Sequence, residues 1–166
     1  FLEKTPSSAE YVLQALVQSF LKQIFKIGLF HADPHPGNFF VTHQGKIVLL
    51  DFGAMGSLSQ EETQNYQKLF FALLLKQKDS LDTLLANCGF SVPDPEKLKS
   101  LLFERPQEWE GLGHFQYYLN VMKETQVQIP DHFVLISRVL ITLGGLLKQY
   151  QVQLDFSQLL GLFTRL

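Results

Sequence analysis

Apolar residues return every three or four positions between residues 9 and 27, with polar residues between them. A stripe of this width predicts an amphipathic helix that packs against a core. Ser7 and Glu10 stand three residues apart at its start, which is the spacing of a capping box. Gly28 predicts the end of the helix. The stripe consists of Val12, Leu13, Leu16, Val17, Phe20, Leu21 and Ile24.

Helical spacing also dominates the chain after residue 58. Ser59 and Glu62 form a second capping box. Asp94 is a typical N-cap, and Pro95 suits the first turn that follows it. Gly89 ends the shorter helix between these two starts. The predicted helices cover residues 59–76, 79–89, 94–104, 115–124, 130–149 and 155–164.

Between the first two helices the pattern changes to short apolar runs. The runs NFFVT and KIVLLDF are joined by His43, Gln44 and Gly45, which predicts a short β-hairpin. The chain has 166 residues, of which 46% are hydrophobic, enough for one packed core. We therefore expect a mainly α fold with a small β-hairpin, in a single domain over residues 1–166.

Charge and cysteine content exclude several classes of protein. A net charge of −2 argues against nucleic acid as a partner, because binding phosphates needs a basic face. The single cysteine, Cys88, excludes an internal disulfide and a multi-cysteine zinc site, and its apolar surroundings predict a buried thiol. No apolar run reaches the length of a membrane span. Because the first residue is Phe1 rather than Met, we expect the chain to be a piece of a longer protein.

The predicted helix over residues 130–149 has two unusual features. Arg138 lies within an apolar run, and a buried cation must be paired. We expect an acidic or carbonyl partner that links the last helices to the loop around Asp33. The adjacent Gly144 and Gly145 each cost the helix about 1 kcal/mol relative to alanine, which predicts a tight helix crossing or a kink.

Residues 28–56 concentrate the polar residues that could carry chemistry. Mg²⁺ prefers carboxylate and other oxygen ligands, with phosphates and waters completing its shell. Asp51 directly follows an apolar run and can supply a carboxylate, and Asn38 can add a neutral oxygen. Asp33 can accept a proton from an attacking hydroxyl or orient it. Two prolines between Asp33 and Asn38 stiffen this loop.

The order of these residues is that of a kinase catalytic loop followed by its metal-binding motif. The segment 31–38 fits H-x-D-x-x-x-x-N, and the segment 51–53 is D-F-G. The runs FHADPHPGNFF and LLDFGAMG resemble the UbiB family of aarF-domain atypical kinases, which is associated with ubiquinone and other prenyl-lipid metabolism. The later run FVLISRVLITLGGLLKQYQVQLDF resembles the same family.

This resemblance implies a protein-kinase-like C-lobe that uses ATP and Mg²⁺. Asp33 would be the catalytic aspartate, with Asn38 and Asp51 as metal ligands. His31 would be the motif histidine, which packs and orients the loop. The residues that would contact the cofactor are His35, Phe52 and Gly53.

Several departures from protein kinases argue against protein substrates. Ala32 replaces the arginine that reads a phosphorylated activation loop. His35 stands where protein kinases place a phosphate-contacting lysine. No A-P-E motif follows Gly53, and the helix cap at Ser59 leaves little room for an activation segment or a peptide platform.

A kinase N-lobe is missing from the sequence. Only eight residues precede the first helix, and neither a Gly-rich loop nor a V-A-I-K-like strand occurs. We therefore expect the chain to be a C-lobe that needs the N-lobe of its parent chain, and to hydrolyse ATP very poorly alone. Besides the nucleotide, the resemblance implies a prenyl lipid or a membrane surface as partner, at the cytoplasmic face of a membrane or in an organelle.

Three other functions stay open. Small-molecule kinases of the aminoglycoside or choline type share a D-x-H-P-x-N loop, here residues 33–38, but usually lack the strict D-F-G. A pseudokinase-like module could use the apolar helices to bind a lipid or a partner. A metal-dependent hydrolase could use His31, Asp33 and His35, whose alternation would place them on one face of an extended segment.

Overall fold

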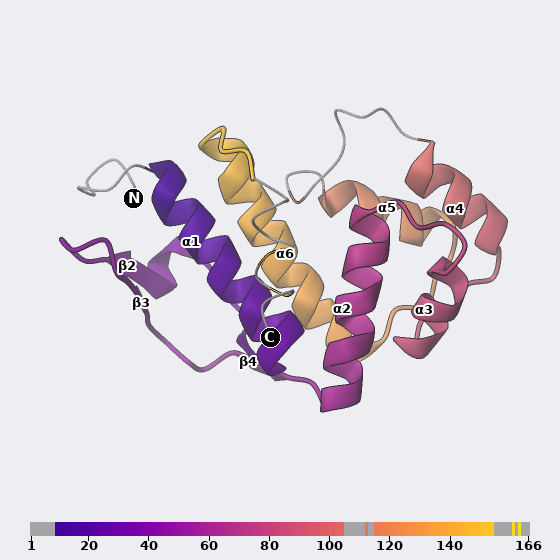
Figure 1. Cartoon of the computed structure of the whole chain (residues 1–166), viewed down its shortest axis with the longest axis horizontal. Coiled ribbons are helices and arrows are strands. Elements are labelled where there is room, and N and C mark those ends of the chain that lie inside the picture. Colours follow the sequence, from indigo (N-terminus) through magenta and orange to yellow (C-terminus); the bar gives the residue numbers. More distant parts are fainter. Residues whose placement is uncertain (1–8, 105–111, 113–114, 155–160, 162, 164–166) are drawn as a thin grey trace.

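The computed structural model describes residues 9–104, 112, 115–154, 161 and 163. These residues are mostly helical, with four strands of three residues each (Figure 1). The mainly α fold class predicted from the sequence is therefore confirmed. The α-helices are α1 (Ala9–Lys22), α2 (Gln60–Leu74), α3 (Leu81–Asn87), α4 (Pro95–Phe103), α5 (Phe115–Glu124) and α6 (Asp131–Gln149). The strands are β1 (Leu29–His31), β2 (Phe39–Val41), β3 (Ile47–Leu49) and β4 (Met55–Ser57).

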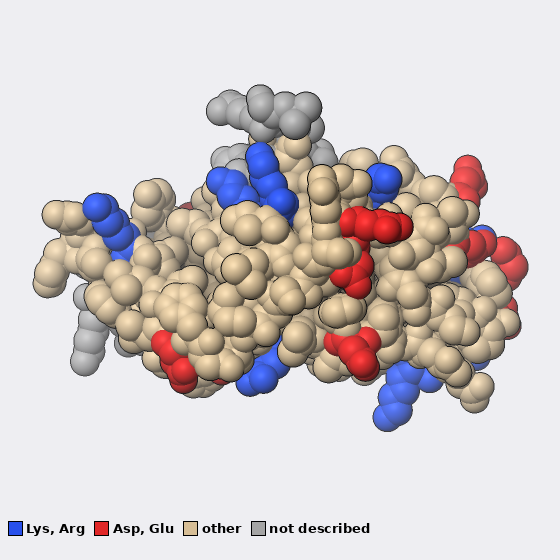
Figure 2. Space-filling model, turned by 90° about the horizontal axis from the view of Figure 1, so that it is seen from below, with Lys and Arg blue, Asp and Glu red and all other residues tan. Residues whose placement is uncertain are grey.

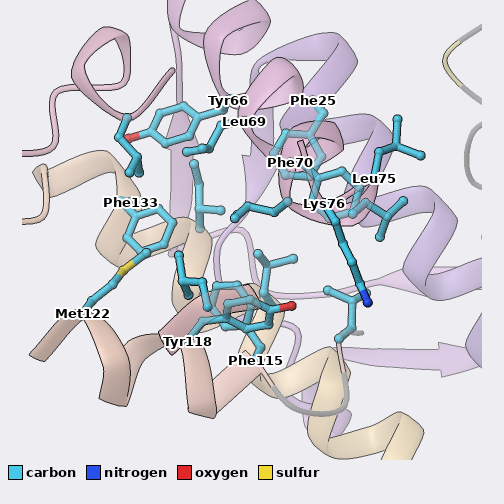
Figure 3. A pocket seen from close by; sticks show the side chains of 17 residues that line it. Phe25, Tyr66, Leu69, Phe70, Leu75, Lys76, Phe115, Tyr118, Met122 and Phe133 are labelled. Carbon is cyan, nitrogen blue, oxygen red and sulfur yellow. The ribbon is translucent and has the colours of Figure 1, made fainter. Parts of the chain in front are cut away.

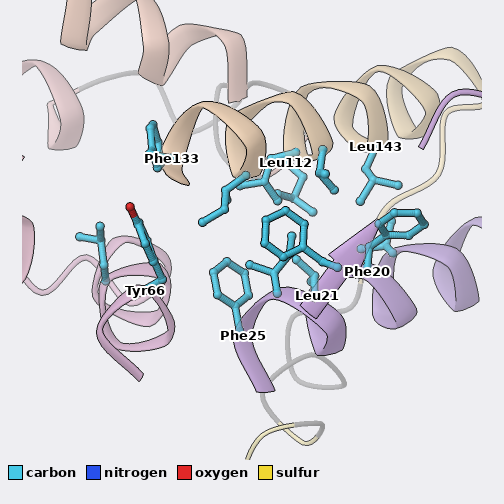
Figure 4. Close-up of a cluster of buried hydrophobic side chains, with 14 of the residues drawn as sticks. Phe20, Leu21, Phe25, Tyr66, Leu112, Phe133 and Leu143 are labelled. Carbon is cyan, nitrogen blue, oxygen red and sulfur yellow. The ribbon is translucent and has the colours of Figure 1, made fainter. Parts of the chain in front are cut away.

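Helix α1 and helix α6 lie side by side, and both contribute many buried apolar residues to the core (Figure 1). The whole predicted stripe of α1 is buried. Figure 4 shows Phe20 and Leu21 of α1 facing Leu143 of α6, with Tyr66 of α2 and Phe133 of α6 farther along. Ser7, half of the predicted capping box, lies outside the described residues.

The first helix ends in a π-helical turn, η2 (Gln23–Ile27). Gly28 closes it with φ +77° and donates its N–H to the Gln23 carbonyl at 2.9 Å. This is a left-handed residue at a helix end, where glycine is favoured because it lacks a Cβ. The turn buries Ile24 and Phe25 and sends the chain directly into β1.

Two antiparallel strand pairs follow. The predicted hairpin is confirmed as β2 and β3, with Phe40 opposite Val48. The sequence prediction missed the other pair, β1 with β4, in which Phe30 lies opposite Gly56. Gly56 is needed there because a Cβ would come within 2.3 Å of the Phe30 ring. Three-residue strands far apart in sequence give no periodic signal, and the second of them centres on a glycine.

The helices after residue 58 agree closely with the predictions. The capping box of α2 is confirmed, since the Ser59 side chain accepts from the Glu62 N–H and the Glu62 carboxylate accepts from the Ser59 N–H. The helix ends at Leu74 rather than near residue 76, because Lys76 turns into the left-handed region at φ +55°. The predicted 155–164 helix falls almost wholly outside the described residues.

The glycine pair of α6 does not interrupt the helix. The helix runs without interruption from Asp131 to Gln149, and Gly144 is buried. A Cβ on Gly145 would meet no atom within 4 Å. The prediction of a tight crossing is therefore wrong for Gly145, which faces open space.

An apolar cavity of about 220 Å³ lies between α2, α5 and α6 (Figure 3). Its walls include Leu69 of α2, Phe115 of α5 and Phe133 of α6. The phenol of Tyr66 also lines it, and burial raises the pKa of that group. Lys76 stands at the edge.

The remaining surface and core features are simple. Cys88 is buried as predicted, and burial raises the pKa of its thiol to about 12. On the face in Figure 2, basic and acidic side chains are interspersed between wide uncharged areas. None of the helices in the described residues combines the length and the apolar character needed to traverse a bilayer.

Candidate functional site

The candidate site lies in the motif segment, defined here as residues 28–58, between η2 and α2. Its loops are fixed at both ends by backbone hydrogen bonds. Ala32 donates to the Ala54 carbonyl at 2.9 Å, beyond the β1–β4 pair, and Leu50 donates to the Asn38 carbonyl at 2.7 Å, beyond the β2–β3 pair. These two hydrogen bonds hold the segments 33–38 and 50–54 close to each other.

The His31 ring joins the two segments. It is 1% exposed, and its Nε2 lies 3.0 Å from both the Leu50 and the Asp51 carbonyl oxygens. Its Nδ1 accepts the Asp33 N–H at 3.1 Å. These partners fit the tautomer with its proton on Nε2, where a donor is needed. One buried ring therefore sets the backbone of both predicted site aspartates.

The surroundings of His31 hold the ring in place. The ring packs edge-on against Phe20 of α1 at 6.2 Å and against Phe52 at 5.6 Å between centroids. The backbone N–H of His31 donates to the Gln23 Oε1 of the π-helical turn at 3.0 Å. This geometry is what the interpretation of His31 as a packing and orienting residue requires. The Gln23 contact was missed, because sequence patterns do not mark the π-helical turn.

Asp33 and Asn38 form a hydrogen-bonded pair across the catalytic-type loop. The Asn38 Nδ2 donates to the Asp33 Oδ2 at 2.9 Å and to the Asp33 carbonyl at 3.1 Å. Between them, Pro36 begins a 3₁₀ turn, η3 (Pro36–Asn38), in which Asn38 donates to the His35 carbonyl at 2.8 Å. Because the amide nitrogen makes both bonds to Asp33, neither bond uses the Asn38 Oδ1.

Asp33 has a second neighbour, the positively charged Arg138 of α6. The Arg138 Nη2 lies 2.9 Å from the Asp33 Oδ1. The predicted link between the last helices and the Asp33 loop is therefore confirmed. The reason given for it was wrong in one respect: the Arg138 side chain is 56% exposed rather than buried, because it extends from the helix surface toward the loop.

Asp51 adopts a left-handed backbone conformation, with φ +52°. The other described non-glycine residues with positive φ each lie two positions beyond the end of a helix, whereas Asp51 does not. Its Oδ1 accepts the Gly53 N–H at 3.2 Å, which makes an Asx-type turn. The turn leaves the Asp51 carboxylate exposed, along with Phe52 and Gly53. Non-glycine strain of this kind gathers at functional sites.

His35 makes a local contact within its own loop. Its ring is exposed, and its Nδ1 accepts the Gly37 N–H at 3.1 Å. Both ring nitrogens of His31 are already hydrogen-bonded. Among the described residues, no group of three or more His, Cys, Asp and Glu side chains could hold a metal ion. The structure thus does not assemble His31, Asp33 and His35 into the ligand set of the hydrolase alternative.

The arrangement suits the chemistry of a magnesium–nucleotide complex. The Asp33 and Asp51 carboxylates and the Asn38 amide oxygen belong to the two segments that the His31 ring joins. One or two carboxylates are the usual protein share of a Mg²⁺ shell when phosphates supply the rest.

The family model for the ABC1 atypical kinase-like domain matches residues 1–85, which include every predicted site residue. The chain belongs to the ABC1 atypical kinase-like family.

Proposed function

We propose that this chain is the C-lobe of a UbiB-like atypical kinase that binds Mg²⁺–ATP. Asp33 would orient the acceptor, and Asn38 with Asp51 would hold the metal ion. The rest of the nucleotide site would come from an N-lobe elsewhere in the parent protein. By resemblance, the reaction would serve ubiquinone or other prenyl-lipid metabolism.

The proposed reaction is transfer of the γ-phosphoryl group to a hydroxyl or to water. The acceptor oxygen forms a bond to the γ-phosphorus, and the bond from that phosphorus to the β–γ bridging oxygen breaks. ADP leaves with the bonding electrons, and the acceptor proton passes to the Asp33 carboxylate. Positioning and charge stabilisation supply most of the rate enhancement in such reactions.

The available oxygen atoms fit Mg²⁺. Asp51 keeps its Oδ2 outside the Asx-type turn, and Asn38 keeps its Oδ1 outside the bonds to Asp33. When bound, Mg²⁺ would offset the negative charge that the phosphates bring to the site. The exposed His35 and Phe52 would lie against the nucleotide.

The observation that carries this proposal is the hydrogen bonding of His31. One ring fixes the Asp33 N–H on one side and the Asp51 carbonyl on the other. Burial requires both ring nitrogens to be hydrogen-bonded, and here their partners belong to the two segments that carry the aspartates. We infer that His31 preorganises two loops that each carry one aspartate, Asp33 to orient the acceptor and Asp51 to hold the metal ion.

Nucleotide-dependent thermal stabilisation of the full-length protein tests the proposal. ATP or ADP at about 100 times its dissociation constant should stabilise the folded state by about 2.7 kcal/mol, and only with Mg²⁺ present. Asp51→Asn should abolish this shift, whereas Asp79→Asn, an exposed aspartate outside the motif segment, should keep it. If neither nucleotide shifts the wild type, the kinase function is wrong.

A second candidate function is a non-catalytic module that binds an apolar ligand. The observation that favours it is the cavity of about 220 Å³ between α2, α5 and α6. Empty apolar cavities destabilise a protein in proportion to their volume, so an apolar occupant would stabilise the fold. A prenyl-lipid analogue that raises the melting temperature without nucleotide, with no effect of Asp51→Asn on that rise, would favour the module.

A further inference from the structure

The ion pair between Arg138 and Asp33 joins two parts of the chain that are 105 positions apart in sequence. Arg138 belongs to α6, which packs against α1 and against β4. Its neighbours Ser137 and Val139 are buried, so the backbone that carries the arginine is set within the core. The packing of α6 in the core therefore fixes the position from which the Arg138 side chain reaches the Asp33 loop.

Arg138 completes the restraint of the Asp33 carboxylate. Asn38 holds Oδ2 at 2.9 Å, and Arg138 holds Oδ1 at 2.9 Å. Because the two bonds engage different oxygens, they fix the plane of the carboxylate as well as its position. An ionised carboxylate has about four acceptor positions, so lone pairs remain for an acceptor hydroxyl.

The loop itself carries no cation. Residues 29–45 contain neither lysine nor arginine, and His35 stands where protein kinases place their phosphate-contacting lysine. Arg138 brings a guanidinium beside Asp33 from outside this loop. Among the described residues, the only side-chain hydrogen bond of that guanidinium is the one from Nη2 to Asp33, and the side chain is 56% exposed.

We propose that Arg138 is a positioning residue for phosphoryl transfer, which holds the Asp33 carboxylate in its working orientation. The proposal rests on the function proposed above. It adds a residue beyond the matched stretch of residues 1–85, so that the second half of the chain becomes part of the site. The guanidinium also offsets the repulsion between Asp33 and incoming phosphates, because it places a permanent positive charge beside the carboxylate.

Steady-state Mg²⁺–ATP hydrolysis by the full-length protein tests this role. Arg138→Met should lower kcat by about 100-fold, the usual effect of a misplaced catalytic group, while the KM for ATP changes less than about threefold. Arg138→Lys should recover part of the loss. Guanidinium ion added to Arg138→Ala should restore turnover in a saturable way, which a purely structural role would not allow.

Two controls make the result decisive. Lys148→Met removes an exposed cation from the last turn of the same helix and should leave kcat unchanged. Asp33→Asn should abolish turnover. Wild-type rates that survive in Arg138→Met, alongside loss in Asp33→Asn, would overturn the role of Arg138 alone. Turnover that does not depend on Asp33 would overturn both this role and the proposed function. If Arg138→Met fails to fold, Arg138→Lys and guanidinium rescue still decide the question.

Discussion

The motif segment and the helices around it reach order by different means. In the helices α1, α2, α5 and α6, buried apolar side chains provide the contacts, and the core is continuous between them. In the motif segment the strands are only three residues long, and hydrogen bonds from the His31 ring and from backbone groups hold the loops. Apolar burial therefore stabilises the helices, whereas hydrogen bonds set the conformation of the motif segment.

This difference predicts how substitutions should act. Burial of apolar surface contributes much to the free energy of folding and does not depend on direction. The hydrogen bonds of a loop contribute less to that free energy and require a specific geometry. Changes in the helices should therefore lower stability first. Changes at exposed site residues such as Asp51 should lower activity with little effect on stability. His31 belongs to both regions, since its ring also packs against Phe20 of α1.

Leu143→Ala gives the largest expected effect and tests the helical side of the comparison. Leu143 is fully buried against α1 (Figure 4), so the truncation should lower the free energy of unfolding by about 2–5 kcal/mol, measured by urea denaturation. Val134→Ala, at a 49% exposed position on the same helix, should change it by less than about 0.5 kcal/mol. Equal effects at the two positions would contradict the assignment of the core.

Gly56→Ala tests whether the motif segment contains a packing constraint of its own. The new Cβ would lie 2.3 Å from the Cζ of Phe30, a ring that is 1% exposed, so the substitution should cost about 1–3 kcal/mol. Gly145→Ala is the matched control, because its Cβ meets no atom within 4 Å. It should stabilise α6 by about 0.5–1 kcal/mol.

A double-mutant cycle with Phe30→Leu identifies the cause of the Gly56 effect. If the ring is the obstacle, the Gly56→Ala penalty should shrink by at least about 0.5 kcal/mol when Phe30 is already leucine. A penalty as large as that of Leu143→Ala, and independent of Phe30, would break the comparison. The motif segment would then be as much a part of the packed core as the helices are.

Sequence patterns predicted the two regions unequally. The predictions of the apolar stripe of α1 and of the Ser59–Glu62 capping box rest on local spacing, and the structure confirms both. The β1–β4 pair depends on a ring lying over a glycine 26 residues away, which no local pattern encodes. The exposure of Gly145 depends on which neighbour each turn of α6 meets, and that is set by tertiary packing.

The candidate site was predictable in its residue types and less so in its connections. The order of Asp33, Asn38 and Asp51 is visible in the sequence. The Arg138 link was anticipated because a cation in an apolar run needs a partner, although the side chain proved to be exposed. The left-handed conformation of Asp51 could not be predicted, since it depends on the turn that Gly53 closes.

The smallest expected effect concerns Glu62, at the junction of the motif segment and α2. The hydrogen bond from the Ser59 N–H, aided by the nearby His132, lowers the pKa of the Glu62 carboxyl below its ordinary value of 4.5. A lowered folded-state pKa stabilises the protein above the unfolded pKa, and the benefit is lost as the pH falls through the folded-state value.

Glu62→Gln should therefore lower the free energy of unfolding at pH 7 by about 0.3–1 kcal/mol, the usual effect of a charge at a helix N-terminus. The difference from wild type should persist down to about pH 5 and then vanish as the wild-type carboxyl is protonated. Glu61→Gln, in the same first turn, should show a smaller pH-dependent difference, because no hydrogen bond from Ser59 reaches that side chain. A difference for Glu62→Gln that stays constant from pH 7 to pH 3 would mean that the carboxylate charge contributes nothing. The junction would then be held by the shape of the capping box, as the hydrogen bonds of the His31 ring hold the loops of the motif segment.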